Sequence, residues 1–189
     1  MSTLKPLLFL CASAFSVTAC ADVSGTDALT RLLTTVSDRL SIADQVALSK
    51  WDSGKPIQDS PREAQVIAAA TQLASTYKLE PQDVSQLLAA QIEANKLVQY
   101  ALLAKWREAG DAPDSPRPDL VGQIRPQLDL LQRRLLADYA AFAPWRKDPQ
   151  CATWLSEESL RLARDPIHDL ALIRATGELC ITAKQLPSS

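Results

Sequence analysis

The sequence predicts an all-α protein with a single six-helix domain. Alanine, leucine and glutamine dominate the 189 residues, only 5 are glycine, and no segment alternates apolar and polar residues with period two. Apolar residues instead recur every three or four positions over long stretches, which is typical of the buried face of an amphipathic helix. The chain is long enough to bury one core.

Residues 1–21 resemble an export signal. Lys5 precedes an apolar run that is too short for a stable membrane span, and small residues follow it. Cleavage after Ala21 would release residues 22–189 as a periplasmic or secreted bacterial protein. The same region also resembles a lipobox, in which Cys20 would be lipidated and retained, so a lipoprotein is the alternative.

The expected first helix carries cations on the face that should be buried. Thr26 is its expected N-cap, and the helix ends near Trp51. Arg39 and Lys50 lie about three turns apart on one face. Long cations can extend to the rim of a core, but a buried unpaired cation costs on the order of several kcal/mol, so this pair should face carboxylates or a ligand. The whole seam reads Leu29, Leu32, Val36, Arg39, Ala43, Val46 and Lys50.

The second helix begins with a capping box. Ser60 is its expected N-cap, a proline follows, and Glu63 can reach back to the cap. Arg62 is unfavourable in a first turn because a cation there opposes the helix dipole. Its presence indicates an anion nearby, and Asp59 is close enough to orient it. We expect this helix to continue to about Tyr77.

The third helix, from Pro81 to about Ala109, carries two neutral amides on its apolar seam. Asn95 and Gln99 are one turn apart on the same face. Buried amides must be hydrogen-bonded. The pair therefore belongs either to an internal polar network or to a ligand site.

Residues 110–118, which contain three prolines, should connect two helical halves. The fourth helix is expected over residues 119 to about 142. Arg134 lies one position from its apolar stripe, and Arg133 points further outward.

The last part of the chain should hold two shorter helices, over about residues 152–164 and 167–184. Cys151 and Cys180 are most simply one disulfide in an exported protein, and closing that loop is worth roughly 3 kcal/mol. The single histidine, His168, has no ligand-like neighbours at short spacing, so we expect no metal site and place it at the surface or between helices.

The charge pattern favours a small anionic ligand. A formal net charge of −2 gives no footprint for nucleic acid, while cations gather on one inner seam. The sequence holds no glycine-rich phosphate loop and no serine or cysteine nucleophile paired with a histidine.

Three motifs together resemble those of the all-helical chorismate mutases. They are R-L-x-x-A-D-x-V-A-x-x-K-W at 39–51, P-I-x-D-x-x-R-E at 56–63 and Q-I-E-A-N-K-x-x-Q-Y at 91–100. The export signal, the C-terminal extension and the cysteine pair make the chain more similar to the secreted gamma subclass. The match is strongest over residues 31–107 and weaker from 119 onward.

The resemblance implies a domain plan and a site. Residues 22–112 would form the catalytic helices, residues 113–189 the helical extension, and a homodimer is possible. Arg39 and Arg62 would hold the substrate carboxylates, and Arg134, or else Arg133, would supply one more cation. The implied site also includes Lys50 and Gln99 at the ether oxygen, Asn95 near the substrate hydroxyl or carboxylate, and Asp59 and Glu63 as supporting acids.

The implied reaction, the Claisen rearrangement of chorismate to prephenate, is unimolecular and needs no nucleophile, metal or cofactor. Planar guanidinium groups can hold two carboxylates in the folded, reactive geometry. Two alternatives are a non-catalytic exported protein that binds chorismate or a related dianion, and a helical envelope lipoprotein with Arg39 and Lys50 in interfacial ion pairs.

Overall fold

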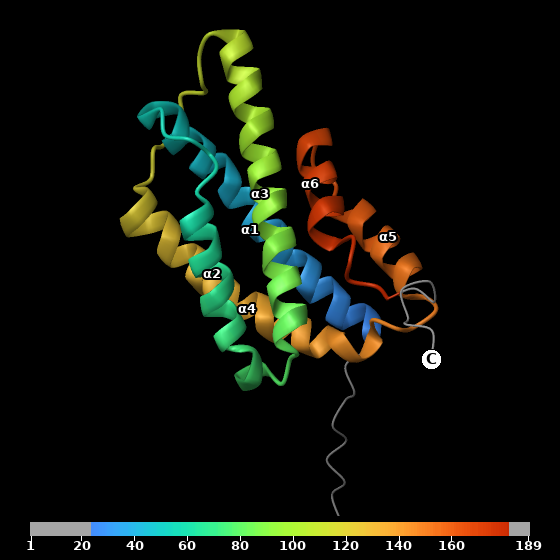
Figure 1. Ribbon diagram of the computed structural model, residues 1–189. Coiled ribbons are helices and arrows are strands. Elements are labelled where there is room, and N and C mark those ends of the chain that lie inside the picture. The colour runs from blue at the N-terminus through green and yellow to red at the C-terminus, as the bar shows by residue number, and fades with distance from the viewer. Residues whose placement is uncertain (1–23, 182–189) are drawn as a thin grey trace, which may run out of the picture.

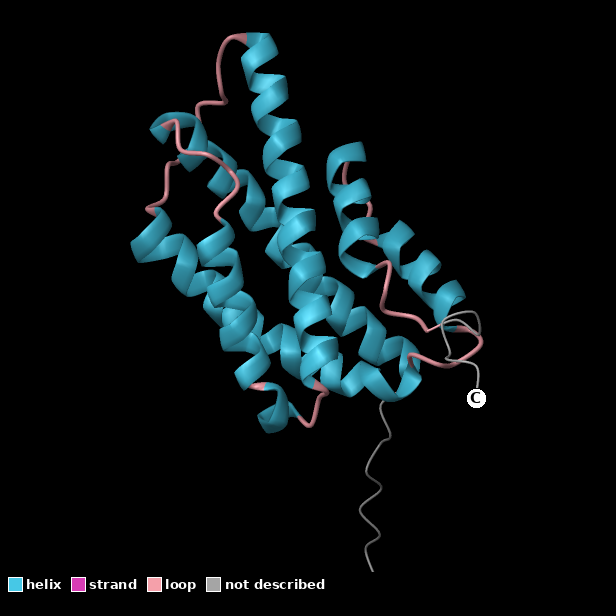
Figure 2. Cartoon of the chain, viewed as in Figure 1, coloured by secondary structure: helices cyan, strands magenta, loops and turns pink. Residues whose placement is uncertain are grey.

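The fold is built from helices alone over residues 24–181, the part of the chain that the computed structural model describes (Figures 1 and 2). The expected export signal and Cys20 lie outside these residues. The all-α, six-helix prediction is confirmed: the α-helices are α1 (Gly25–Ser53), α2 (Ser60–Gln72), α3 (Pro81–Ala109), α4 (Arg125–Phe142), α5 (Cys151–Arg161) and α6 (Pro166–Thr176). Three short helical turns accompany them: η1 (Ala74–Tyr77), η2 (Leu120–Ile124) and η3 (Ala143–Trp145).

The core lies where α1 packs on α3 and α4. The expected seam of α1 faces it, since Leu29, Leu32 and Val36 are fully buried. The large side chains Tyr139 and Phe142 from α4 fill the same core. In Figure 1, α2 lies along one side of α3, while α5 and α6 lie on the other. The long helices α1 and α3 are therefore the scaffold shared by both halves of the chain.

Two expected helix starts are wrong by one or two residues. Ser24, not Thr26, caps α1, because its hydroxyl accepts from the Asp27 backbone N–H at 3.1 Å. Asp59, not Ser60, caps α2, because its carboxylate accepts from the Arg62 backbone N–H at 3.2 Å. Serine and aspartate are both good N-caps, so composition alone does not choose between neighbouring candidates.

The middle of the chain follows the prediction closely. Helix α3 has the expected bounds, and Gly110 ends it in the left-handed conformation that favours glycine. The fourth helix starts after Asp119 as expected, but its first turn, η2, is π-helical and continues into α4. The predicted second helix ends early as α2 and is followed by the separate turn η1.

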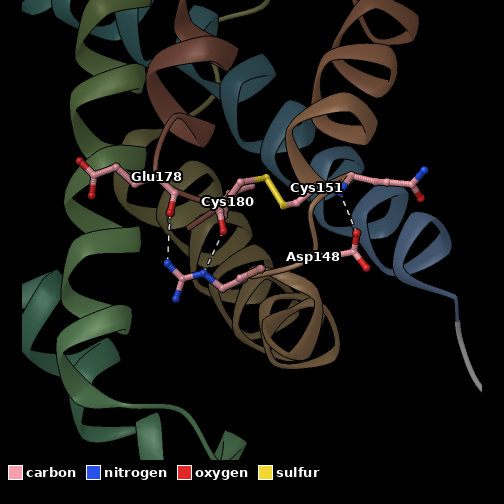
Figure 3. Close-up of a disulfide and its surroundings, with 7 residues drawn as sticks. Asp148, Cys151, Glu178 and Cys180 are labelled. Carbon is pink, nitrogen blue, oxygen red and sulfur yellow. Dashed lines mark hydrogen bonds between the residues drawn. A yellow bond between two sulfur atoms is a disulfide. The ribbon is translucent and has the colours of Figure 1, made fainter. Parts of the chain in front are cut away.

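The disulfide predicted for the C-terminal extension is confirmed. Cys151, at the start of α5, is bonded to Cys180 (Figure 3). Helices α5 and α6 are both shorter than predicted; the chain leaves α6 at Gly177 in a tight turn and then donates from the Ile181 N–H to the Arg146 carbonyl at 2.8 Å. A helix continued to residue 184 would not make this turn.

His168 lies between helices, as one of its two expected placements had it. The residue is 7% exposed. Its Nδ1 lies 2.7 Å from Asp165 and its Nε2 lies 3.0 Å from Asp44 on α1. Two carboxylates distant in sequence therefore meet at His168 and attach α6 to α1.

Candidate functional site

A cavity of about 180 Å³ lies between α1, α2, α3 and α4. Most of the polar residues singled out in the sequence line it. Five cations contribute to its wall (Arg39, Lys50, Arg62, Lys96 and Arg125) against three carboxylates (Asp59, Glu63 and Asp129). The excess of two positive charges matches a dianionic ligand.

Arg39 brings a desolvated charge into this wall. The residue is 8% exposed, and one guanidinium nitrogen donates to the Leu128 carbonyl at 3.3 Å. Its Nε is buried and has no partner among the described residues. Burial lowers the pKa of Arg39 to about 10, although Asp129 acts in the opposite direction. The side chain is therefore still protonated at neutral pH, with a donor left free.

Lys50, in the last turn of α1, and Arg62, in the first turn of α2, both line the cavity. The Lys50 ammonium donates to the Pro56 carbonyl at 2.7 Å, which ties α1 to the loop before α2. Asp59 receives the backbone N–H of Arg62 rather than its guanidinium, so it acts as a helix cap and not as the side-chain partner that the sequence suggested. Within residues 24–181 the guanidinium of Arg62 forms no hydrogen bond or ion pair, and it is available to an anion.

Asn95 and Gln99 form a short polar chain on α3. The Asn95 amide donates to the Arg39 carbonyl at 3.3 Å, and its side-chain oxygen accepts from Gln99 Nε2 at 2.7 Å. The buried Oε1 of Gln99 has no partner in the described part of the chain. This arrangement leaves the second N–H of the Gln99 amide for a ligand.

Glu63 is held from two sides. One carboxylate oxygen accepts from the Asp59 backbone N–H at 3.0 Å, and the other accepts from the Lys96 ammonium at 3.1 Å. The expected reach of Glu63 back to the helix start is thus present, one residue earlier than predicted. Lys96 was not singled out in the sequence.

Arg134 does not line the cavity. Its guanidinium lies 3.3 Å from Asp38 and 3.7 Å from Asp138, and half of the side chain is exposed. The cation that α4 does bring to the cavity is Arg125. Nine residues separate the two, about two and a half turns, so they point to opposite sides of the helix. Arg133 is exposed and is also absent from the cavity wall.

The sequence held no comparable signal for Arg125. The expected fourth helix begins at residue 119, and the structure places the turn η2 before Arg125, so this cation lies beyond the first turn, where the helix dipole does not single it out.

Gln91 is a further cavity residue that the sequence did not mark as functional. It is 2% exposed, and its amide donates to the Ala175 carbonyl of α6 at 3.1 Å. Its Oε1 is buried without a partner among residues 24–181. Arg39, Gln91 and Gln99 hold the unpartnered buried side-chain atoms found in the described residues, and all three line this cavity. A ligand bound there could supply the missing partners.

Two kinds of feature are absent from residues 24–181. These residues contain no cluster of three or more histidine, cysteine, aspartate or glutamate side chains arranged to hold a metal ion. No helix among them has both the length and the apolar composition needed to cross a bilayer.

Comparison with known proteins points to one family. Residues 28–100 match the family model described as chorismate mutase type II. The secreted chorismate mutase of Mycolicibacterium smegmatis is 35% identical over 156 residues, which cover 80% of this chain and 86% of that protein. The secreted chorismate mutase of Mycobacterium tuberculosis is 31% identical over 165 residues, covering 85% of this chain and 82% of that one.

Solved structures agree with the sequence relatives. The crystal structure of a chorismate mutase from Burkholderia phymatum has a TM-score of 0.81 and 44% identity, with 84% of this chain and 99% of that chain covered. A chorismate mutase from Burkholderia thailandensis has a TM-score of 0.75 and 37% identity, covering 81% and 99%.

Proposed function

This chain belongs to the chorismate mutase type II family, and we propose that it is an isomerase that rearranges chorismate to prephenate in the cavity described above. The single observation that carries the proposal is the cavity wall itself, with an excess of two positive charges and unpartnered atoms of Arg39, Gln91 and Gln99. Chorismate is a dianion, so its charge complements the wall. The reaction is unimolecular, and the groups it needs are donors and cations already present.

The arginines are proposed to hold the two carboxylates. Arg39, Arg62 and Arg125 come from three different helices and converge on one cavity. Guanidinium groups bind carboxylates in a planar, bidentate manner. Fixing both carboxylates would restrain the enolpyruvyl arm over the ring and replace a costly conformational search with a bound, near-reactive geometry.

Lys50 and Gln99 are proposed to act on the breaking bond. Negative charge develops on the ether oxygen as the C–O bond lengthens. A charged donor and the free N–H of Gln99 would then stabilise the transition state more than the ground state. Asn95 supports this role because its side-chain oxygen accepts from Gln99 Nε2 and so fixes the orientation of the Gln99 amide. Glu63 and Asp59 would accept hydrogen bonds or hold the cations in place.

The required energy is within reach of these groups. An acceleration on the order of 10⁶ corresponds to about 8 kcal/mol of barrier lowering. Electrostatic stabilisation by one well-placed donor is worth roughly 3–4 kcal/mol, and conformational restraint can contribute a similar amount or more.

We also propose that residues 22–189 act outside the cytoplasm, as an exported enzyme, because the mycobacterial relatives are named secreted chorismate mutases. A homodimer remains a prediction, which light scattering after size-exclusion chromatography would test. Binding of chorismate without turnover, and a structural lipoprotein, are the less favoured alternatives, because the implied site residues other than Arg134 all line the cavity.

The test is the loss of chorismate absorbance on adding purified residues 22–189, beside the Lys50→Ala variant. Rapid loss with prephenate formed, and at least about a 100-fold lower kcat/KM in the variant, is the expected result. If folded, disulfide-bonded wild-type protein leaves chorismate unchanged, catalysis is excluded. Calorimetric titration with chorismate would then distinguish the binding protein from the lipoprotein.

A further inference from the structure

Lys96 lies on α3, one residue after Asn95, and its side chain is saturated with partners. The residue is 7% exposed. Its ammonium lies 3.0 Å from the Gln58 side-chain oxygen, 3.1 Å from Glu63 and 2.7 Å from Glu93. An ammonium has three hydrogens to donate. All three are used, so Lys96 lines the cavity without a donor to spare for a ligand.

The partners of Lys96 lie at the start of α2. Gln58 belongs to the preceding loop and also donates to the Ser60 hydroxyl at 3.0 Å. Glu63 belongs to the first turn, and its other oxygen accepts from the Asp59 backbone N–H. One ammonium on α3 therefore fixes both sides of the junction from which Arg62 enters the cavity.

Electrostatics support the same arrangement. Burial alone would lower the pKa of Lys96, but hydrogen bonds to Glu93 and Glu63 outweigh it and the pKa is raised. The Lys96 ammonium is therefore charged at neutral pH. Its charge also offsets the carboxylate of Glu63, which would otherwise stand unneutralised in a cavity meant for an anion.

We propose that Lys96 is a positioning residue, which holds Glu63 and the first turn of α2 against α3 so that Arg62 faces the substrate carboxylate. The inference rests on the proposed function for its kinetic consequence, but its structural part concerns the ligand-free protein. Lys96 differs in role from the cations that contact substrate, because it acts on binding through Glu63 and Arg62.

The kinetic test compares Lys96→Met with Lys105→Met. Lys105 is exposed on the same helix and forms no hydrogen bond or ion pair within residues 24–181. Lys96→Met should raise KM about tenfold and change kcat less than about threefold, whereas Lys105→Met should match the wild type. Lys96→Arg should recover part of the loss. An unchanged KM, or a loss in kcat alone, would overturn the proposal.

A double variant and an activity-independent measurement complete the test. Adding Glu63→Gln to Lys96→Met should change KM by less than about a further threefold, because both substitutions break the same contact; a KM restored to the wild-type value would show charge compensation instead and overturn the positioning role. In the ligand-free protein, hydrogen exchange at the Asp59 and Arg62 amides should be faster in Lys96→Met and unchanged in Lys105→Met. Faster exchange in Lys96→Met would support the positioning role, and unchanged exchange would refute it. Both conclusions hold even if the wild-type protein does not convert chorismate.

Discussion

The side-chain oxygen of Asn95 accepts a hydrogen bond from Gln99 Nε2 at 2.7 Å, one helical turn further along α3. Asn95 is itself anchored to the Arg39 backbone carbonyl. These two hydrogen bonds orient the neutral amide of Gln99 in the cavity, and a neutral amide donates at any pH. The pH dependence of the enzyme should reflect that choice of residue.

We therefore expect kcat/KM of the wild type to be nearly flat from mildly acidic to mildly basic pH, and that of Gln99→Glu to be shifted toward acid. Glutamic acid donates only when protonated, and its free pKa is about 4.3. The control is Gln65→Glu, an exposed position on α2. The measurement is kcat/KM between pH 5 and 9, roughly two units either side of neutral. A wild-type profile that collapses above neutral pH would contradict the prediction.

The alkaline limit should come from Arg39. Because burial lowers its pKa to about 10, its charge is present below that pH and is lost as pH rises through it. Loss of the charge removes a carboxylate contact, so kcat/KM should fall as pH approaches 10. An extended pH profile would show this decline in the wild type.

Arg125 and Arg134 make a matched pair on α4. Arg125→Ala should lower kcat/KM by about 10- to 100-fold, the size expected for a hydrogen bond between charged groups. Arg134→Ala removes only ion pairs from a half-exposed guanidinium to Asp38 and Asp138, outside the cavity; such pairs contribute little, so its kcat/KM should stay within about twofold. Steady-state kinetics of the two variants decides, and the reverse order of effects would reject the cavity assignment.

The disulfide should stabilise the fold without supporting turnover. Cys151 and Cys180 close a loop over a separation of 29 residues, so replacing both with serine should cost roughly 3 kcal/mol. That corresponds to a Tm lower by about 6–12 °C. Neither cysteine lines the cavity, and kcat/KM at 25 °C, a temperature well below melting for most domains of this size, should be unchanged. Reductant should lower the Tm of the wild type and leave that of the variant as it is.

Asp165 should make the attachment of α6 sensitive to acid. It caps α6 by accepting from the Ile167 and His168 backbone N–H groups. Burial would raise the pKa of Asp165, but hydrogen bonds from the backbone and ring of His168 outweigh it and hold the pKa below its ordinary value. A depressed carboxyl pKa stabilises the fold above the unfolded value, and this contribution is lost as pH falls through the folded value.

Accordingly, Asp165→Ala should lower the free energy of unfolding by about 1–2 kcal/mol at pH 7, as for other lost N-caps. The deficit should shrink below about pH 4, near the free pKa of aspartate. Urea unfolding at several pH values measures it, with Asp114→Ala in the exposed connector as control. A deficit that stays constant down to strongly acidic pH would contradict the argument.

Much of the site could be predicted from residues that break a pattern. Arg39 and Lys50 interrupt an apolar seam, and Asn95 and Gln99 interrupt another. The structure places all four in one cavity. A buried face tolerates polar groups only where they gain partners, so each interruption carries information about position.

Other parts could not be predicted because they depend on tertiary contacts. The orientation of α4 about its own axis places Arg125, and not Arg134, in the cavity. The π-helical turn η2, directly before α4, alters that orientation. Lys96 looks like an ordinary surface lysine three residues after Glu93, and only the approach of Gln58 and Glu63 shows otherwise. Two helix starts were off by one or two residues because Ser24 and Thr26, like Asp59 and Ser60, are all suitable N-caps.

The origin of Arg125 has a consequence for how the enzyme behaves on dilution. Arg39, Lys50, Arg62 and Arg125 all belong to one chain, so a cavity with its full set of cations does not require a second subunit. Turnover per mole of chain should therefore be independent of enzyme concentration down to the detection limit, and mixing two inactive variants, each lacking a different cation, should restore nothing.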